Sequence, residues 1–252
     1  MKASLSRRML AELLGTGLLV TVVVGSGIAA QTLSRDTGVQ LLANALATTA
    51  GLAVLILVFG PISGAHFNPV VSLADWLLGR RSGTGLAVPE LVGYLPAQVL
   101  GAIGGAVLAN AMFARPLVAW STHRRSAGHL WLAEIVATAG LLLVIVALAR
   151  AGRGGQTAWA VGAYIGAAYW FTSSTAFANP AVTIGRAFSD TFAGIAPASV
   201  PAFLVAQLAG GALGMALIRA LFPDSSTVAD RMLVPHPAGT AGLPESVDAP
   251  RP

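Results

Sequence analysis

The sequence contains no cysteine, and only 10% of its 252 residues are charged. The first absence excludes disulfides, thiolate metal sites and a cysteine nucleophile, although it leaves the cellular compartment open. The second argues against an ordinary soluble domain, in which about 25% of residues are charged. Hydrophobic residues instead make up 55% of the chain. Disorder over most of the length is therefore excluded as well, because so apolar a chain would not stay solvated.

The few charges that are present give a net charge of +5. Nucleic acid binding would need the basic residues gathered on one face, whereas here they are scattered between apolar runs. We therefore expect no nucleic acid partner. In a protein with several membrane spans, a positive balance more commonly reflects basic cytoplasmic loops.

Long apolar runs account for most of the remaining chain. A helix that crosses the ~30 Å hydrocarbon core of a lipid bilayer needs roughly 20 apolar residues. Such runs predict six spans, at residues 9–30, 40–60, 89–112, 129–150, 156–174 and 199–221. The first follows basic residues, as the core of a signal peptide would. It is longer than the about 7–15 residues of such a core and contains Glu12, so we interpret it as a retained span.

An even number of spans places both termini on the same side of the membrane. If the N-terminus is cytoplasmic, ten of the 15 Lys and Arg residues lie on the cytoplasmic side, as the positive-inside rule requires. The pair Arg124–Arg125 falls on the other side and runs against this trend. Residues 223–252 lack apolar periodicity, and we expect them to form a flexible cytoplasmic tail.

Three landmarks recur in the same order in the two halves of the chain, at about residues 8–112 and 129–222. Ala-Glu-x-x-x-Thr opens the first and fourth spans, Asn-Pro follows the second and fifth, and Gln-x-x-Gly-x-x-x-Gly lies in the third and sixth. The corresponding residues are Glu12 and Glu134, Asn68-Pro69-Val70 and Asn179-Pro180-Ala181, and Gln98 and Gln207. Each half has an odd number of spans, so the second copy enters the membrane inverted. Inverted repeats are typical of transport proteins and channels, with the functional site near the midplane.

The two Asn-Pro segments predict helices of half the usual length. Pro is tolerated in the first turn of a helix, and Asn is a preferred N-cap. Asn68 and Asn179 would each begin a helix of about 10 residues, or roughly 15 Å, which is half of a bilayer. The irregular backbone before each Asn is possible at that depth only where it lines a wet cavity or is buried in protein. The two half-helices would then meet with their N-termini at the centre.

These motifs, together with the Ser-Gly-Ala-His-Phe lead-in to Asn68, resemble those of the aquaporin (major intrinsic protein) family over about residues 8–222. The resemblance implies an all-α membrane protein with six transmembrane helices and two re-entrant half-helices in an hourglass fold. It also implies a homotetramer in the inner (plasma) membrane, with one pore in each protomer. We expect no cofactor, no metal site and no enzyme activity, because the sequence shows neither a nucleophile–base set nor a metal cluster.

The resemblance also assigns roles to the residues at the meeting point. The amides of Asn68 and Asn179 would donate hydrogen bonds to a small neutral solute. Two facing helix N-termini, each carrying about +0.5 charge, would oppose protons and cations. Glu12 and Glu134 would accept hydrogen bonds from the backbone of the re-entrant loops. Loop carbonyls would line one wall of the pore, namely those of Gly64, Ala65, His66, Thr175, Ala176 and Phe177. The side chain of His66 is expected to be packed, and Val70, in place of the usual Ala, to require only a packing adjustment.

The selectivity filter departs from the family pattern. Most members have Arg directly after the second Asn-Pro-Ala, whereas this sequence has Val182. Counting back from the two Asn residues places the other filter positions at Thr48, Ala167 and Ala176. A slip of one residue would exchange Thr48 for Thr49 and rotate the side chain by about 100°. All four assigned residues are small and uncharged, which predicts a wide and weakly polar constriction.

Two charged residues lie seven positions after the Asn residues, Asp75 in the first half and Arg186 in the second. Arg186 is also four residues after Val182 and therefore lies on the same helix face, one turn further along. These residues could place a charge in each vestibule of the pore, or they could be half-helix ends that are solvated at the membrane interface. We favour the second interpretation.

A wide, uncharged filter predicts a passive channel of the bacterial aquaglyceroporin type. The expected solutes are glycerol and other polyols, urea, undissociated metalloid acids and water. A water-selective channel is the first alternative, and it would need a narrower constriction than these residues provide. A proton-coupled secondary transporter is the second, and it would need a titrating carboxylate that faces the substrate path.

Overall fold

The computed structural model describes residues 3–80 and 83–222, and every regular element in this part of the chain is helical. The first half comprises α1 (Leu5–Leu33), α2 (Thr37–Ser63), α3 (Pro69–Gly79) and α4 (Val88–Met112). The second half comprises α5 (Gly128–Arg150), η1 (Gly154–Gln156), α6 (Thr157–Phe171), α7 (Pro180–Arg186), η2 (Pro197–Ser199) and α8 (Val200–Leu221). The predicted all-α fold is confirmed, whereas the tail predicted at 223–252 lies outside the described residues.

Within the described residues, five helical segments are long and apolar enough to cross a membrane, namely Leu5–Leu33, Thr37–Ser63, Val88–Met112, Gly128–Arg150 and Pro197–Leu221. The span predicted at 156–174 corresponds to α6, which has 15 residues. At 1.5 Å per residue α6 is about 22 Å long, shorter than the hydrocarbon core. It ends at Phe171, where the chain turns into the second re-entrant loop.

Small residues allow the long helices to approach closely within each half. A Cβ atom placed on Gly101 of α4 would lie 2.2 Å from the carbonyl oxygen of Leu13 in α1, and one on Gly105 would lie 2.0 Å from that of Gly17. In the second half, a Cβ on Gly210 of α8 would lie 2.6 Å from the carbonyl oxygen of Ile135 in α5. The two Gly-x-x-x-Gly pairs therefore bring α1 against α4 and α5 against α8, as small residues do between transmembrane helices.

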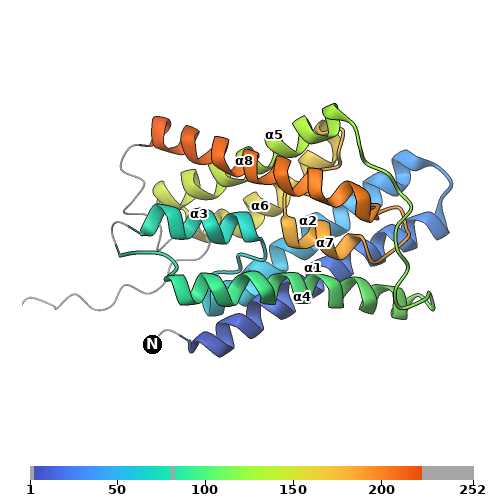
Figure 1. Ribbon diagram of the computed structural model, residues 1–252, viewed down its shortest axis with the longest axis horizontal. Helices are drawn as coiled ribbons and strands as arrows, with labels where there is room; N and C mark the ends of the chain where they lie inside the picture. The colour runs from blue at the N-terminus through green and yellow to red at the C-terminus, as the bar shows by residue number, and fades with distance from the viewer. Residues whose placement is uncertain (1–2, 81–82, 223–252) are drawn as a thin grey trace, which may run out of the picture.

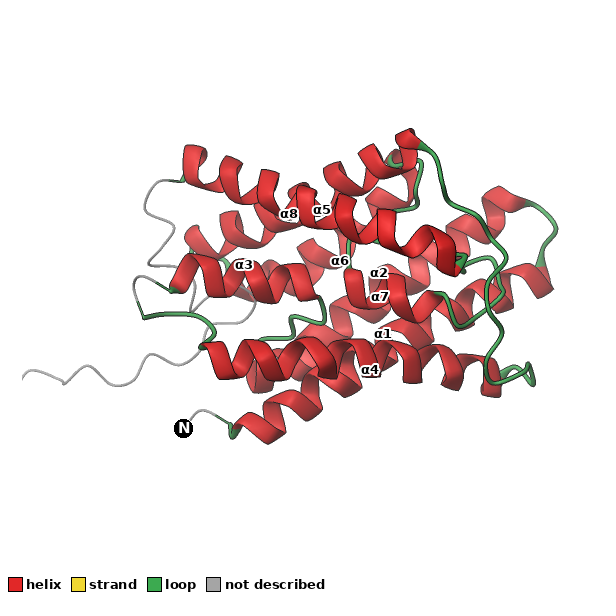
Figure 2. Ribbon diagram, in the orientation of Figure 1, coloured by secondary structure: helices red, strands yellow, loops and turns green. Residues whose placement is uncertain are grey.

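The two short helices lie between the long ones and enter from opposite ends of the bundle (Figures 1 and 2). The N-terminus of α3 and the N-terminus of α7 both point towards the middle, and each follows an irregular loop that is drawn green in Figure 2. Asn68 caps α3 by accepting a hydrogen bond from the Val70 N–H at 3.0 Å. Asn179 caps α7 by accepting from the N–H groups of Ala181 and Val182 at 3.0 Å and 3.2 Å.

The outward faces of the long helices carry large apolar side chains. Leu46 and Leu100 are each 61% exposed, and Val205 is 67% exposed. Other exposed apolar residues on these faces are Leu10, Leu14, Leu18, Leu42, Val54, Leu108, Leu132, Val136 and Leu208. A continuous apolar exterior of this kind marks a surface that is covered by something other than water. Together with the long apolar helices, it shows a multi-pass membrane protein.

Candidate functional site

A cavity lies where the two re-entrant loops meet, and both halves of the chain contribute to its wall. Apolar side chains from α1, α2, α5 and α6 form most of this wall, and polar groups lie at the loops, on α7 and at Thr48 and Tyr169. The lining residues are Leu19, Val23, Thr48, Leu52, Ile56, Ala65, His66, Phe67, Asn68, Val71, Leu141, Ile145, Val161, Ile165, Tyr169, Ala176, Phe177, Ala178, Asn179, Val182 and Arg186. The cavity is therefore mainly apolar, with a strip of polar groups.

The side-chain amides of Asn68 and Asn179 cross at the centre of this cavity. Each oxygen caps its own helix, and each nitrogen reaches the opposite loop. Asn68 Nδ2 donates to the Ala178 carbonyl at 2.8 Å, and Asn179 Nδ2 donates to the Phe67 carbonyl at 2.7 Å. Because an amide nitrogen carries two hydrogens, this arrangement leaves each Asn with a second N–H for another acceptor. Capping and solute binding are thus compatible in one side chain.

The loops hold a left-handed backbone at equivalent places. Non-glycine residues rarely adopt positive φ, yet φ is 51° at Ala65 and 50° at Phe67 in the first loop. In the second loop, φ is 45° at Ala176 and 48° at Ala178. Backbone strain of this kind persists only where the surrounding structure fixes it. The two loops therefore share one unusual conformation, which turns successive carbonyl groups in different directions.

Two buried carboxylates hold these loops in place. Glu12 accepts hydrogen bonds from the backbone N–H groups of His66 and Phe67 at 3.0 Å and 2.7 Å, and from Gln98 at 2.7 Å. Glu134 makes the same set of contacts in the second half, with donors at 2.9, 2.8 and 2.7 Å from Phe177 N, Ala178 N and Gln207 Nε2. Neither Glu lines the cavity. Both side chains point at the loop backbone and away from the solute path.

The predicted carbonyl acceptors lie only partly on the cavity. Ala65, His66, Ala176 and Phe177 line it, whereas Gly64 and Thr175 do not. The carbonyl oxygens of Ala65, Ala176 and Phe177 accept no hydrogen bond from the residues that the structure describes. They are therefore available to a solute. The His66 side chain is packed, because its ring lies edge-on to Tyr94 at 5.6 Å between centroids and its Nδ1 is 3.0 Å from Ser72 Oγ.

The predicted filter positions fall into two groups. Thr48, Ala176 and Val182 line the cavity, and Thr48 Oγ1 lies 3.2 Å from the hydroxyl of Tyr169. The alternative residue Thr49 donates instead to the Ala45 carbonyl of its own helix at 2.8 Å and is not a lining residue.

Ala167 was placed wrongly, because it is exposed on α6 and does not line the cavity. The residues of α6 that do so are Val161, Ile165 and Tyr169, which are spaced four apart along one helix face. Ala167 is two positions from Tyr169 and therefore points about 200° away from it. Counting residues from Asn179 missed Tyr169, whereas the four-residue period along α6 would have found it.

The preferred interpretation of Arg186 and Asp75 is also wrong, since neither side chain is solvated at an interface. Arg186 is 2% exposed, lines the cavity and donates from Nε to the Ala193 carbonyl. The chain after α7 is covered by the loop at residues 113–127, through hydrogen bonds from Ser121 N to the Ala187 carbonyl at 3.0 Å and from Ala196 N to the His123 carbonyl at 2.8 Å. Asp75 is 3% exposed and accepts from Leu86 N at 2.7 Å.

An inverted repeat whose two half-helices meet head-on over a buried cavity defines a membrane channel or transporter, because irregular backbone at membrane depth is found where it lines such a cavity. The family model described as Major intrinsic protein matches residues 1–173 and 154–244. The chain therefore belongs to the major intrinsic protein family, whose members are channels and not enzymes.

Individual relatives support this assignment. The chain is 49% identical over 224 residues to "Aquaglyceroporin AqpS" of Rhizobium meliloti, a match that covers 89% of this chain and 94% of the relative. It is 31% identical over 258 residues to the "Glycerol uptake facilitator protein" of Pseudomonas aeruginosa, covering 86% and 89% of the two chains. The X-ray structure of the aquaglyceroporin from Plasmodium falciparum has the same fold, with a TM-score of 0.63, 23% identity, and coverage of 89% of this chain and 100% of that one.

Proposed function

We propose that this chain is a passive channel for glycerol and similar small uncharged solutes. The observation that carries the proposal is the division of the cavity into a polar strip and an apolar wall. The strip consists of the Asn68 and Asn179 amides and the carbonyls of Ala65, Ala176 and Phe177, which accept no hydrogen bond from the described part of the chain. A polyol has the matching division, because its hydroxyl groups lie along one edge and its C–H groups along the other.

The hydrogen bonds of the Asn pair support this role. Each amide already has its oxygen and one N–H in use, so its orientation is fixed before a solute arrives. The remaining N–H can then donate without the entropic cost of ordering the side chain. The names of the relatives point in the same direction, since one is an aquaglyceroporin and another a glycerol uptake facilitator.

The filter of the proposed channel consists of Thr48, Ala176 and Val182, with Tyr169 in place of Ala167. Three of these side chains are small or medium in size, and the two hydroxyl groups of Thr48 and Tyr169 face one another. This set favours passage of polyols, urea, undissociated metalloid acids and water. The first charge occurs one turn beyond Val182, at Arg186.

A proton-coupled transporter has less support. Glu12 and Glu134 are both 0% exposed, and their oxygens accept hydrogen bonds from the loops. A carboxylate that couples transport to protons would have to face the solute path. Light scattering from proteoliposomes tests the proposal directly. Glycerol should enter down its gradient at a rate that an imposed pH gradient does not change, and accumulation above the external concentration would refute a passive channel.

We further propose that the protein is a homotetramer in the plasma membrane, with both termini in the cytoplasm. The excess of basic residues on the side of the N-terminus supports this topology. Because the chain has no cysteine, single-cysteine variants can test it without any background. Arg35→Cys should react with an impermeant maleimide added to intact cells, and Arg153→Cys should react only after lysis. Native mass spectrometry of the purified protein should give the mass of four chains.

A further inference from the structure

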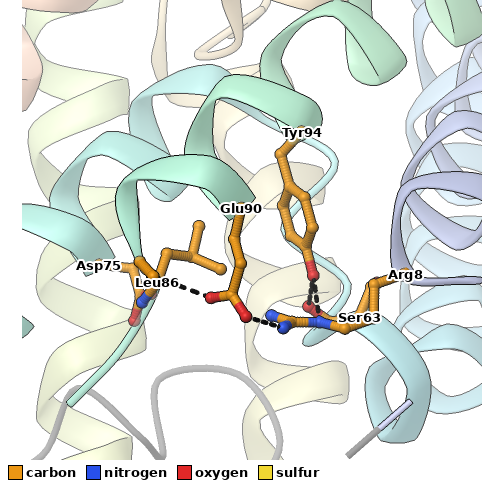
Figure 3. A network of polar contacts seen from close by, with 7 residues as sticks. Arg8, Ser63, Asp75, Leu86, Glu90 and Tyr94 are labelled. Carbon is orange, nitrogen blue, oxygen red and sulfur yellow. Dashed lines mark hydrogen bonds and ion pairs between the residues drawn. The ribbon is translucent and has the colours of Figure 1, made fainter. Parts of the chain in front are cut away.

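The two ends of the cavity can be compared position by position, because the two halves of the chain form equivalent hydrogen bonds. At the α3 end, the carbonyl that begins the re-entrant loop belongs to Ser63, and the hydroxyl of Tyr94 donates to it at 2.7 Å. Arg8 Nε donates to this hydroxyl at 2.9 Å, and Arg8 is paired with Glu90 (Figure 3). This end therefore contains an arginine whose charge is balanced by a carboxylate.

At the α7 end, the equivalent carbonyl belongs to Ser174, and an arginine from the loop between α4 and α5 binds it. Arg125 donates from Nη1 to Ser174 at 3.3 Å and from Nε to the Gly194 carbonyl at 3.1 Å. Ser199 occupies the place that corresponds to Glu90, since each stands eight residues before the repeated Gln of its half, Gln98 or Gln207. Its hydroxyl accepts from the Arg125 N–H at 3.0 Å. The arginine is thus kept at this end, and the carboxylate is not.

The second charged position strengthens the asymmetry. Seven residues after each Asn, the α3 end has Asp75 and the α7 end has Arg186. Within residues 3–80 and 83–222, neither Arg125 nor Arg186 forms an ion pair. The oxygens of Glu134 already accept from the second loop, and Asp190 is bound to the N–H and hydroxyl of Thr122. Among the described residues, the α7 end therefore carries two buried cations that form no ion pair, and Glu134 is the carboxylate whose charge acts on both of them.

The two cations share one aromatic ring. The guanidinium carbon of Arg186 lies 3.4 Å from the centroid of Phe177, and that of Arg125 lies 5.0 Å from it. Both charges are therefore close to the same point of the cavity wall, because Phe177 is itself a lining residue. Burial lowers the pKa of Arg125 to about 10, which still leaves it charged at neutral pH. Two like charges held this close favour the approach of a counter-charge.

From this geometry we propose that the α7 end of the cavity is a binding site for a small monovalent oxyanion, such as nitrate or formate. Arg186 contacts the anion, because it lines the cavity and only its Nε–H has an acceptor among the described residues. The planar fork of its terminal N–H groups matches two oxygens of a planar anion. Arg125 does not line the cavity. Its positive charge lies against the ring of Phe177, which does, and attracts the anion from behind that ring.

The rest of the cavity explains why the anion stays at this end. Leu52, Ile56, Ile145 and Val161 contribute apolar side chains to the lining of the same cavity. An anion that left Arg186 would lose water along these apolar side chains, which is costly, and only the free N–H groups of Asn68 and Asn179 would replace that water. A bound anion should therefore occupy the path of the neutral solutes and slow them.

The test is glycerol flux in proteoliposomes with nitrate on both sides, compared with a bulky sulfonate buffer anion at equal ionic strength. We expect nitrate to reduce the glycerol rate of the wild type at least twofold and in a saturable way. Arg125→Gln should raise the half-inhibitory concentration at least tenfold, because it removes one of the two positive charges beside a partly buried anion. Arg186→Lys keeps the charge but loses the fork, and it should weaken inhibition as well. The ratio of rates with and without nitrate is internal to each preparation, so it does not depend on how much protein is active.

Arg124→Gln is the matched control. Arg124 is the exposed neighbour of Arg125, so this substitution removes one positive charge from the surface and leaves Arg125 in place. It should leave inhibition within twofold of the wild type. Equal loss in Arg124→Gln and Arg125→Gln would show a general surface potential and refute the site. Absence of any nitrate effect on the wild type would refute it outright.

A second readout is independent of glycerol transport. Binding to the folded state alone raises its stability, so nitrate should raise the thermal unfolding midpoint of the detergent-solubilised wild type more than that of Arg125→Gln. If the protein does not conduct glycerol but nitrate stabilises it in this selective manner, the proposed function fails and the anion site stands. If glycerol passes and neither readout responds to nitrate, the anion site fails and the channel stands.

Discussion

Replacing Val182 by Arg tests the filter most directly, because the sequence resemblance to the family predicts Arg at this position. Val182 is 5% exposed and lines the cavity close to Thr48 and Tyr169. An arginine there adds a long side chain with N–H donors on every terminal nitrogen to a constriction that has only two hydroxyl groups. We expect glycerol to slow at least tenfold more than water, since about 1.4 kcal/mol of additional barrier is sufficient for a tenfold change.

The structure adds a cost that the sequence alone does not reveal. Arg186 is buried one turn along the same helix, about 6 Å from position 182 along the axis. Two guanidinium charges at ~6 Å repel each other by about 3 kcal/mol at an effective dielectric constant of 20. Water in the cavity reduces this value, so we expect a loss of about 1–3 kcal/mol of stability. The variant should unfold at a lower temperature than the wild type. High salt should make this difference in unfolding temperature smaller, because it screens the repulsion between the two charges.

Stopped-flow light scattering at matched protein content gives the ratio of glycerol to water permeability. Val182→Met is the matched control, since it adds length without charge and should lower the ratio less than Val182→Arg does. An unchanged or larger ratio in Val182→Arg would mean that Val182 is not at the narrowest point. The filter would then have to be redrawn around Tyr169 and Arg186.

Three further predictions concern the supports of the cavity. Asn68→Asp should admit cations or impair assembly, because a carboxylate cancels part of the positive potential of two facing helix ends; unchanged cation exclusion, measured by ion flux, would count against this mechanism. Glu134→Gln should lower the unfolding midpoint by the equivalent of about 1–3 kcal/mol, because an amide oxygen and an N–H₂ group cannot satisfy three donors; a midpoint equal to the wild type would remove Glu134 from its supporting role. Gly105→Ala should destabilise the protein by about 1–3 kcal/mol through overpacking. Gly104→Ala, with no atom within 4 Å of the new Cβ, should be neutral, and equal effects of the two substitutions would contradict the close contact of α1 and α4.

The half-helices and their supports could be predicted from the sequence because the signals are local. Asn before Pro is a capping signal that acts within one turn, and it placed the starts of α3 and α7 correctly. The repeated landmarks predicted the inverted arrangement of the two halves, since each half has an odd number of spans. No distant part of the chain has to be known to infer the two helix starts.

The wall of the filter depends on distant parts of the chain, and here prediction failed. The position of Ala167 was derived by counting from Asn179, which assumes a fixed path between α6 and the loop. The helix instead presents Ile165 and Tyr169 to the cavity. The burial of Arg186 is a similar case, because it depends on the loop at 113–127 folding over the end of α7. Nothing near Arg186 in the sequence indicates that cover.

The comparison of the two halves separates residues that build the channel from residues that give it direction. The skeleton is duplicated, since a buried Glu, a Gln and a left-handed loop hold Asn68 and Asn179 in the same way. A symmetric skeleton by itself gives two equivalent entrances and cannot distinguish them. The charges break this equivalence, because Glu90 and Asp75 at one end correspond to Ser199 and Arg186 at the other. A neutral solute gains little from that difference. An anion, in contrast, meets an arginine that is ion-paired with Glu90 at one entrance and, at the other, two arginines that form no ion pair within the described residues. The asymmetry of charge, placed on a symmetric fold, is therefore where selectivity between charged and uncharged solutes should be sought.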